Sequence, residues 1–181
     1  MSDLVPFPPP PSENHEALYL VGFRLDPAAE APQMYSVFAL YGENDRPATE
    51  GGRVLVFADP ALAGAAVERG DNGVKDVGDV PTEMALICDV AGALHIINSQ
   101  DVDEDGAVLE AINCFDDLIR AVQINVPAQY MSVLSALAER LNEQDEFGTW
   151  LAEQGVDRET VEDAIMWCVG AVAVKSTVVN S

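Results

Sequence analysis

The hydrophobic pattern changes near Gly106, and this change restricts the folds open to the chain. Before it, apolar stretches are short, rich in β-branched and aromatic residues, and bounded by Gly and Pro, as strands usually are. After it, apolar residues recur every three or four positions, as in amphipathic helices. Because strands and helices are segregated along the chain, we expect the α+β class, with an antiparallel sheet of about five strands in the N-terminal half packed against a helical C-terminal half.

The expected strands lie between residues 17 and 100. The first three span residues 17–25, 34–41 and 53–58. A helix should follow them, with Asp59 as its N-cap, Pro60 at its first position and Gly70 after its end.

The clearest strand-pairing signal lies in residues 83–99. Two apolar runs, residues 83–89 and 93–99, flank the sequence DVAG at residues 89–92. Asp at the first and Gly at the fourth position suit a type I turn, and the Gly suits the bulge of a three-residue loop. We therefore expect a β-hairpin here.

Helices are expected from residue 107 to residue 175, followed by either a last strand or a frayed end. They span residues 107–123, 127–141, 146–155 and 157–175. The last of them, capped by Asp157, is apolar on every side in its middle. This pattern predicts either a central position among the other helices or a homodimer interface through residues 161–175.

The organisation expected from these elements is one domain with an arm. Residues 1–16 are rich in proline and form a flexible arm. Residues 17–181 form a single α+β domain, in which residues 17–100 are mainly strands and residues 107–175 are helical.

The charge of the chain is its most unusual feature, because 31 Asp and Glu residues stand against 9 Lys and Arg residues, for a net charge of −22. Residues 1–90 hold 15 of the acids and residues 91–181 hold 16, so the excess belongs to the whole surface. It fits a surface kept hydrated in a salty cytoplasm, a basic partner, or mimicry of nucleic acid. It argues against binding to nucleic acid or to an anionic membrane, since both need cationic groups.

Compartment follows from the cysteines and from the lack of a membrane signal. Cys88, Cys114 and Cys168 are far apart among apolar neighbours, which is typical of reduced core thiols in the cytoplasm. The longest apolar run has 11 residues, 164–174, against the roughly 20 that a span needs. The N-terminal residues lack the basic start and apolar core of a signal peptide. We therefore expect a cytoplasmic protein.

One loop has an acidic pattern that could bind a metal ion. Asp101, Asp103 and Asp105 alternate before Gly106. These residues resemble positions 1, 3, 5 and 6 of the calcium loop of the EF-hand family, but position 12, a bidentate Glu in the family, is Ile112. Acids before a helix also favour its N-terminus as caps. We expect the start of a helix here, with calcium binding as the alternative and no other cofactor.

Cys88 and His95 are the one plausible nucleophile–base pair. A two-residue turn would set them opposite each other, whereas the bulged three-residue turn sets Cys88 opposite Leu94 and His95 opposite Ile87, on opposite faces. Their apolar neighbours favour a core thiol and a half-buried histidine. Adjacent carboxylates such as Asp116-Asp117 should be solvated, because neighbouring helical residues do not face each other.

The function expected from these features is non-enzymatic, and we find no family resemblance across the whole chain. The chain should act through protein–protein contacts, as a monomer or homodimer, by neutralising a basic partner in the manner of an immunity protein or inhibitor. One alternative is a metal- or ligand-responsive regulatory domain that uses the loop of residues 101–105. Another is an enzyme whose scattered site lies near Cys88 and His95.

Overall fold

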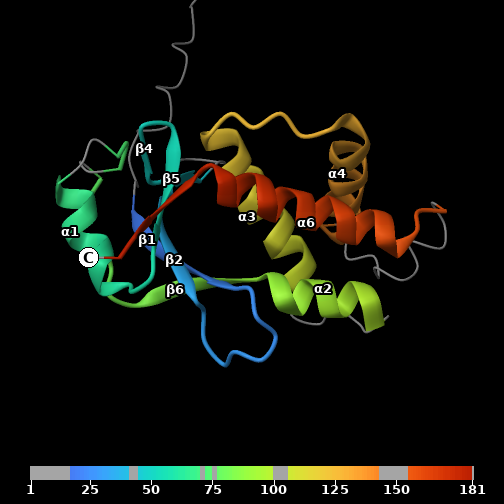
Figure 1. The fold of residues 1–181 in the computed structure, drawn as a ribbon, viewed down its shortest axis with the longest axis horizontal. Coiled ribbons are helices and arrows are strands. Elements are labelled where there is room, and N and C mark those ends of the chain that lie inside the picture. The colour runs from blue at the N-terminus through green and yellow to red at the C-terminus, as the bar shows by residue number, and fades with distance from the viewer. Residues whose placement is uncertain are drawn as a thin grey trace, which may run out of the picture.

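The fold is that of an α+β protein, as the change of periodicity predicted. The computed structural model describes residues 17–40, 45–69, 72–74, 77–99, 106–142 and 155–180. Within these residues, every strand except the last precedes residue 90, and every helix except the first follows residue 89. Figure 1 shows the sheet beside a group of crossing helices.

The sheet is mixed, whereas the sequence predicted antiparallel pairing throughout. Its strands are β1 (Leu18–Arg24), β2 (Met34–Ala39), β3 (Arg46–Pro47), β4 (Thr49–Glu50), β5 (Arg53–Phe57), β6 (Met84–Asp89) and β7 (Ser176–Val179). Hydrogen-bonded neighbours follow the order β4-β5-β2-β1-β6, with β3 on β2 and β7 on β5. The pairs among β1 to β5 are antiparallel, but β6 lies parallel to β1 and β7 parallel to β5. Both late strands return to the sheet after a helix, which is the connection that parallel pairing requires.

Alternating side chains give the sheet a separate core on each face. The side facing the helical group carries Val21, Phe23, Phe38, Val54, Val56 and Cys88. The other side carries Leu20, Val37, Ala39, Leu55 and Phe57, which pack with Ala63 and Val67 of α1 (Ala61–Arg69). The sheet therefore lies between α1 and the other helices, as Figure 1 shows.

The predicted helices of the described regions are present. Asp59 Oδ1 accepts from the Ala61 amide at 2.9 Å and so starts α1 as expected. The others are α3 (Ala107–Ala121), α4 (Ala128–Asn142) and α6 (Arg158–Val174). Asp157 caps α6 by accepting from the Thr160 amide at 2.7 Å. The expected helix at 146–155 lies outside the described residues except for Gly155, and so does the arm of residues 1–16.

The predicted hairpin at residues 83–99 is wrong in its second half. β6 forms as expected, but α2 (Val90–Ser99) follows it without a turn. Asp89 caps this helix, because its Oδ1 accepts from the Gly92 amide at 2.8 Å. Asp and Gly thus occupy a helix start instead of a turn. The run after Gly92 is apolar at most positions, so its periodicity does not separate strand from helix.

The C-terminal region shows both a predicted strand and an open helix face. Residues 176–179 form β7, one of the two outcomes expected there. The inner side of α6 packs on α2, α3 and α4. Its outer side leaves Met166 47% and Val174 72% exposed. Since this helix is not enclosed on all sides, a homodimer through residues 161–175 stays a prediction.

Candidate functional site

The acidic loop at residues 101–105 lies outside the described residues, so calcium binding there stays a prediction. The residue after it, Gly106, has φ 69° and precedes the first turn of α3. Its left-handed conformation suits Gly. Ile112, which stands at the closing position of the resemblance, is buried in α3. Among the described residues, no group of three or more His, Cys, Asp and Glu side chains is placed to hold a metal ion.

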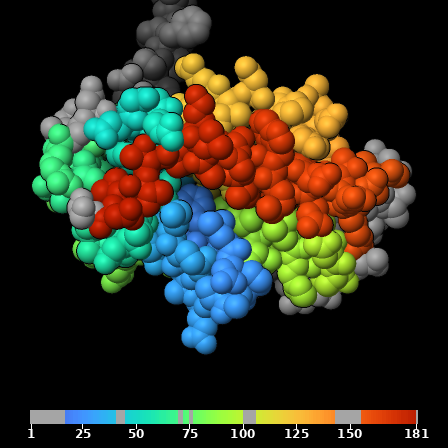
Figure 2. All heavy atoms as spheres, in the orientation of Figure 1, coloured from blue at the N-terminus to red at the C-terminus, as the bar shows by residue number. Residues whose placement is uncertain are grey.

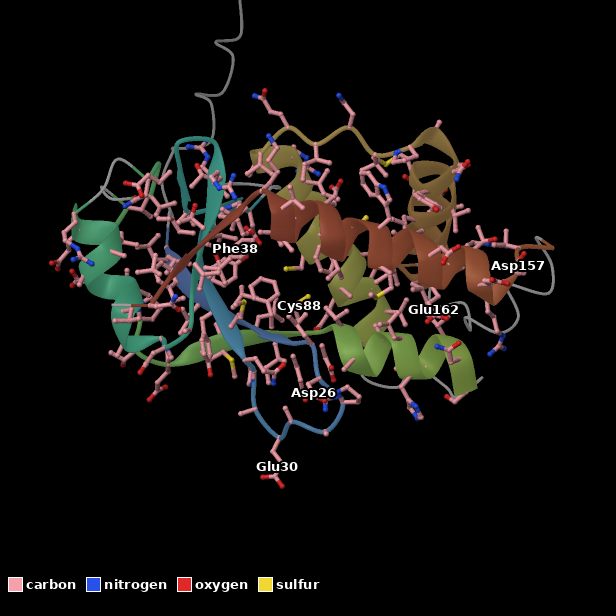
Figure 3. The ribbon with its side chains drawn as sticks, in the orientation of Figure 1. Asp26, Glu30, Phe38, Cys88, Asp157 and Glu162 are labelled. Atoms are coloured by element: carbon pink, nitrogen blue, oxygen red, sulfur yellow. The ribbon has the colours of Figure 1, made fainter. Side chains whose placement is uncertain are left out.

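Cys88 and His95 do not face each other across a hairpin, because Cys88 lies in β6 and His95 in α2. Cys88 lies in β6 with none of its surface exposed, and it points into the core shared with the helices. Figure 3 shows it at the centre of the molecule. His95 lies on the exposed side of α2. The buried thiol matches the core role expected for Cys88, while His95 is exposed and not half-buried.

A polar cluster where the sheet meets α3 was not predicted. We call it the carboxyl cluster, and it comprises Tyr19, Asp45 and Asp117. The Tyr19 hydroxyl donates to Asp45 Oδ2 at 2.5 Å. The Tyr19 ring stacks on Phe38 with 5.6 Å between ring centroids. The cluster therefore joins β1, the segment before β3 and α3.

The carboxyl group of Asp117 in this cluster has a raised pKa. Burial raises its pKa to about 6, and the negative charge of Asp45 acts in the same direction. Arg120 opposes this rise, and its Nη1 lies 3.4 Å from Asp117 Oδ1 while the same guanidinium pairs with Asp116. Asp116 is exposed as expected, whereas Asp117 is only 18% exposed in its side chain. Asp117 therefore exchanges a proton close to neutral pH.

Two buried thiols near the cluster, Cys114 and Cys168, have raised pKa values. A hydrogen bond with Cys88, followed by burial, raises the pKa of the Cys114 thiol well above its ordinary value. Burial also raises the pKa of Cys168 to about 11. The pKa of the Tyr19 hydroxyl is raised as well, chiefly by burial and by its bond to Asp45. Because the thiolate is the reactive form of cysteine, these raised pKa values disfavour reaction of Cys114 and Cys168 at neutral pH.

The helical spacing of the sequence indicates the position of Asp117, but nothing near it in the sequence indicates the approach of Asp45. Asp117 follows Cys114 by three positions, which places both on neighbouring parts of one helix face. Asp45 comes from a distant loop, and a contact across that separation has no periodic signature. Sequence reasoning therefore missed the carboxyl cluster.

An apolar groove opens between the sheet and α6. Its volume is about 160 Å³. Its walls come from β1, β2, β5, β7, α3 and α6 and the residues beside them, namely Phe23, Leu25, Met34, Val54, Val56, Phe115, Leu118, Val169, Val172, Ala173, Ser176 and Val178. Figure 2 shows the face where β7, α6 and the β1–β2 segment meet. This groove is continuous with exposed apolar surface, since Leu25 and Val178 are each 43% exposed.

A second cavity lies among α3, α4 and α6. Its volume is about 150 Å³, and its walls include Phe115, Leu134 and Ile165. Asn113, Asp116 and Ser135 add polar groups to it. Neither cavity is lined by a residue of the carboxyl cluster, so the Asp117 carboxyl group does not face either space.

The arginines of the described regions take part in internal contacts. Arg24 pairs with Asp89, and Arg120 pairs with Asp116. Arg158 Nη1 donates to the Ile97 carbonyl at 2.8 Å. Arg53 Nη2 donates to the carbonyls of Val174 and Ser176 at 2.9 and 2.8 Å. The Arg120–Asp116 pair lies within α3. The contacts of Arg24, Arg158 and Arg53 join different elements of the fold.

The exposed carboxylates are mostly left without such partners. Those with no ion pair or hydrogen bond among the described residues are Glu30, Glu50, Glu68, Asp79, Glu83, Glu139, Glu159 and Asp163. They come from the β1–β2 loop, β4, α1, the segment before β6, α4 and α6. These carboxylates are thus carried by several different elements in the part of the chain that the structure describes.

No helix within the described ranges is long and apolar enough to cross a bilayer. Comparison with protein-family models, curated proteins and solved structures finds no match to this chain.

Proposed function

We propose that this chain is a non-enzymatic binding protein that engages a basic protein partner, as an inhibitor or immunity protein does. The observation that carries the proposal is the contrast between the two kinds of charge. Arginines such as Arg53 and Arg158 are committed to internal hydrogen bonds, whereas exposed carboxylates such as Glu68 have no partner among the described residues. A surface of this kind attracts a cationic protein and accelerates its association.

The arrangement of the other reactive groups supports the same proposal. Cys88 and Cys114 are buried, and their mutual hydrogen bond keeps the Cys114 thiol protonated. The carboxyl cluster does not line either cavity. The three cysteines are unpaired, which suits the reducing cytoplasm as the place of action.

The test is a co-purification at two salt concentrations followed by reconstitution. The tagged chain is used to capture proteins from its native cell extract at about 50 mM NaCl, and the bound fraction is identified by mass spectrometry. The recovered protein is then made separately, and its Kd is measured by calorimetry at about 50 and 300 mM NaCl. We expect a stoichiometric basic protein whose Kd weakens by about tenfold or more at the higher salt.

A variant with fewer surface carboxylates tests whether their negative charge drives association. Glu68→Gln, Glu83→Gln, Glu139→Gln and Glu159→Gln remove exposed carboxylates that have no described partner, so the fold should be retained. This variant should associate more slowly with the same dissociation rate. Recovery of no basic protein at low salt, or a Kd that does not respond to salt, would contradict the proposal.

A further inference from the structure

The apolar groove has the features of a pocket that receives a side chain from another protein. Leu25 and Val178 line it, and each is 43% exposed. An apolar hollow within an exposed apolar surface is typical of an interaction site. The hydroxyl at its wall is already engaged, because Ser176 Oγ donates to the Val172 carbonyl at 2.7 Å. The lining therefore favours an apolar group.

The size of the groove limits the occupant. Its volume of about 160 Å³ is close to the ~150 Å³ of an apolar cavity that accommodates one benzene ring. A leucine or phenylalanine side chain matches this space. A long lipid chain is too large for it.

The charged residues near the groove indicate where the basic part of the partner would make contact. Asp26 and Glu30 are exposed in the loop that joins the groove-lining residues Leu25 and Met34, and Figure 3 shows Glu30 at the tip of that loop. The end near β7 instead carries Lys175 and Arg53. A basic segment of the partner would therefore contact the β1–β2 loop, and its apolar side chain would enter beside it.

The net charge decides between a basic partner and a second copy of this chain. Two copies would each bring a charge of −22 to the contact, and their repulsion opposes close association. A basic partner gains from the same charge. We infer that the groove is the anchor site for one large apolar side chain of a basic protein, whose neighbouring Lys or Arg residues contact Asp26 and Glu30. This inference rests on the proposed function.

The experiment measures the binding of two fluorescein-labelled peptides by fluorescence anisotropy. One peptide has a short run of arginines followed by a phenylalanine, and the other has alanine in place of the phenylalanine. The full chain should bind the phenylalanine peptide about tenfold or more tightly, because burial of the ring adds that much affinity. Both affinities should fall as the salt concentration rises.

Substitutions at neighbouring positions locate the site. Ala173→Trp fills the groove from its wall and should abolish the preference for phenylalanine. Val174→Trp adds similar bulk at the next position, which is exposed and does not line the groove, and should leave the preference intact. Val178→Thr keeps the side-chain shape but makes the rim of the groove polar, and should reduce the preference for phenylalanine by about two- to threefold.

The acidic loop is tested by a separate variant. Asp26→Asn with Glu30→Gln should weaken the binding of both peptides by the same factor. Circular dichroism and melting check that each variant is folded.

The outcomes separate this inference from the proposed function. If both peptides bind equally and respond to salt, or if Ala173→Trp leaves the preference unchanged, the groove is not the anchor site, while the basic partner stands. The neutral dye N-phenyl-1-naphthylamine tests whether the groove binds an apolar group without charge. If neither peptide binds at low salt, but the dye binds the unaltered chain and not the Ala173→Trp variant, both the anchor site and the basic partner are ruled out. A concentration-dependent dimer that occupies the groove would also overturn the inference.

Discussion

Asp117 shows how one residue acquires a property that its sequence neighbours do not share. It stands beside Asp116 on α3, yet Asp116 is exposed and Asp117 is partly buried against the sheet. Burial and the charge of Asp45 raise the pKa of Asp117 to about 6. The periodicity of α3 could place Asp117 next to the buried face, but the approach of Asp45 depends on the tertiary fold and has no signature in the sequence.

The raised pKa of Asp117 predicts an unusual pH dependence of stability. A carboxyl group with a raised pKa in the folded state stabilises the fold below its unfolded pKa, and this contribution is lost as the pH rises through about 6. Asp117→Asn should therefore increase the free energy of unfolding by about 1–3 kcal/mol near pH 8 and change it little near pH 4. Urea unfolding across this range measures the difference. Asp116→Asn is the control and should show no such gain; equal effects of both substitutions would contradict the assignment.

Helices were predicted best where a cap and a regular apolar pattern coincide. Asp59 and Asp157 mark the starts of α1 and α6, and the spacing of apolar residues marks α3. The start of α2 has the same kind of cap in Asp89, but Gly92 suggested a turn. Local residue types at positions 89–92 are compatible with both structures, and the packing of α2 on α3 decides between them.

Alanine should have opposite effects on stability at two helical glycines, Gly92 in α2 and Gly170 in α6. A Cβ at Gly92 would overlap Asp89 Oδ2 and lie 2.8 Å from its Cγ, so Gly92→Ala would displace the carboxylate that caps α2 and pairs with Arg24. A Cβ at Gly170 of α6 would meet nothing within 4 Å. Gly170→Ala should add about 0.5–1 kcal/mol to the free energy of unfolding, whereas Gly92→Ala should lower it by about 1 kcal/mol. Thermal melting measures both. A gain for Gly92→Ala would show that the cap is dispensable.

At the scale of the whole molecule, the α+β fold class was predictable from the sequence, but the directions in which the strands pair were not. Segregated periodicities identify α+β from the sequence. The parallel pairs β1–β6 and β5–β7 join strands that are far apart along the chain, and alternation of side chains is the same for both directions of pairing. The excess of carboxylates is likewise visible in the composition, but the internal use of Arg53 and Arg158 is a property of the fold.

The same charge excess predicts how salt and calcium affect stability. A net charge of −22 makes the folded state repel itself, so raising NaCl from about 50 to 500 mM should raise the Tm by several degrees. CaCl₂ at matched ionic strength should do no more, because Ile112, at the position of the closing EF-hand ligand, is 8% exposed and belongs to the core of α3. A bound calcium ion at a hundred times its Kd would instead add ~2.7 kcal/mol, or on the order of 5–10 °C. Melting with chelator gives the baseline, and Asp103→Asn is the control variant. If calcium raises the Tm by that amount beyond NaCl and the substitution removes the rise, the loop at residues 101–105 binds calcium and the regulatory alternative replaces the binding of a basic protein.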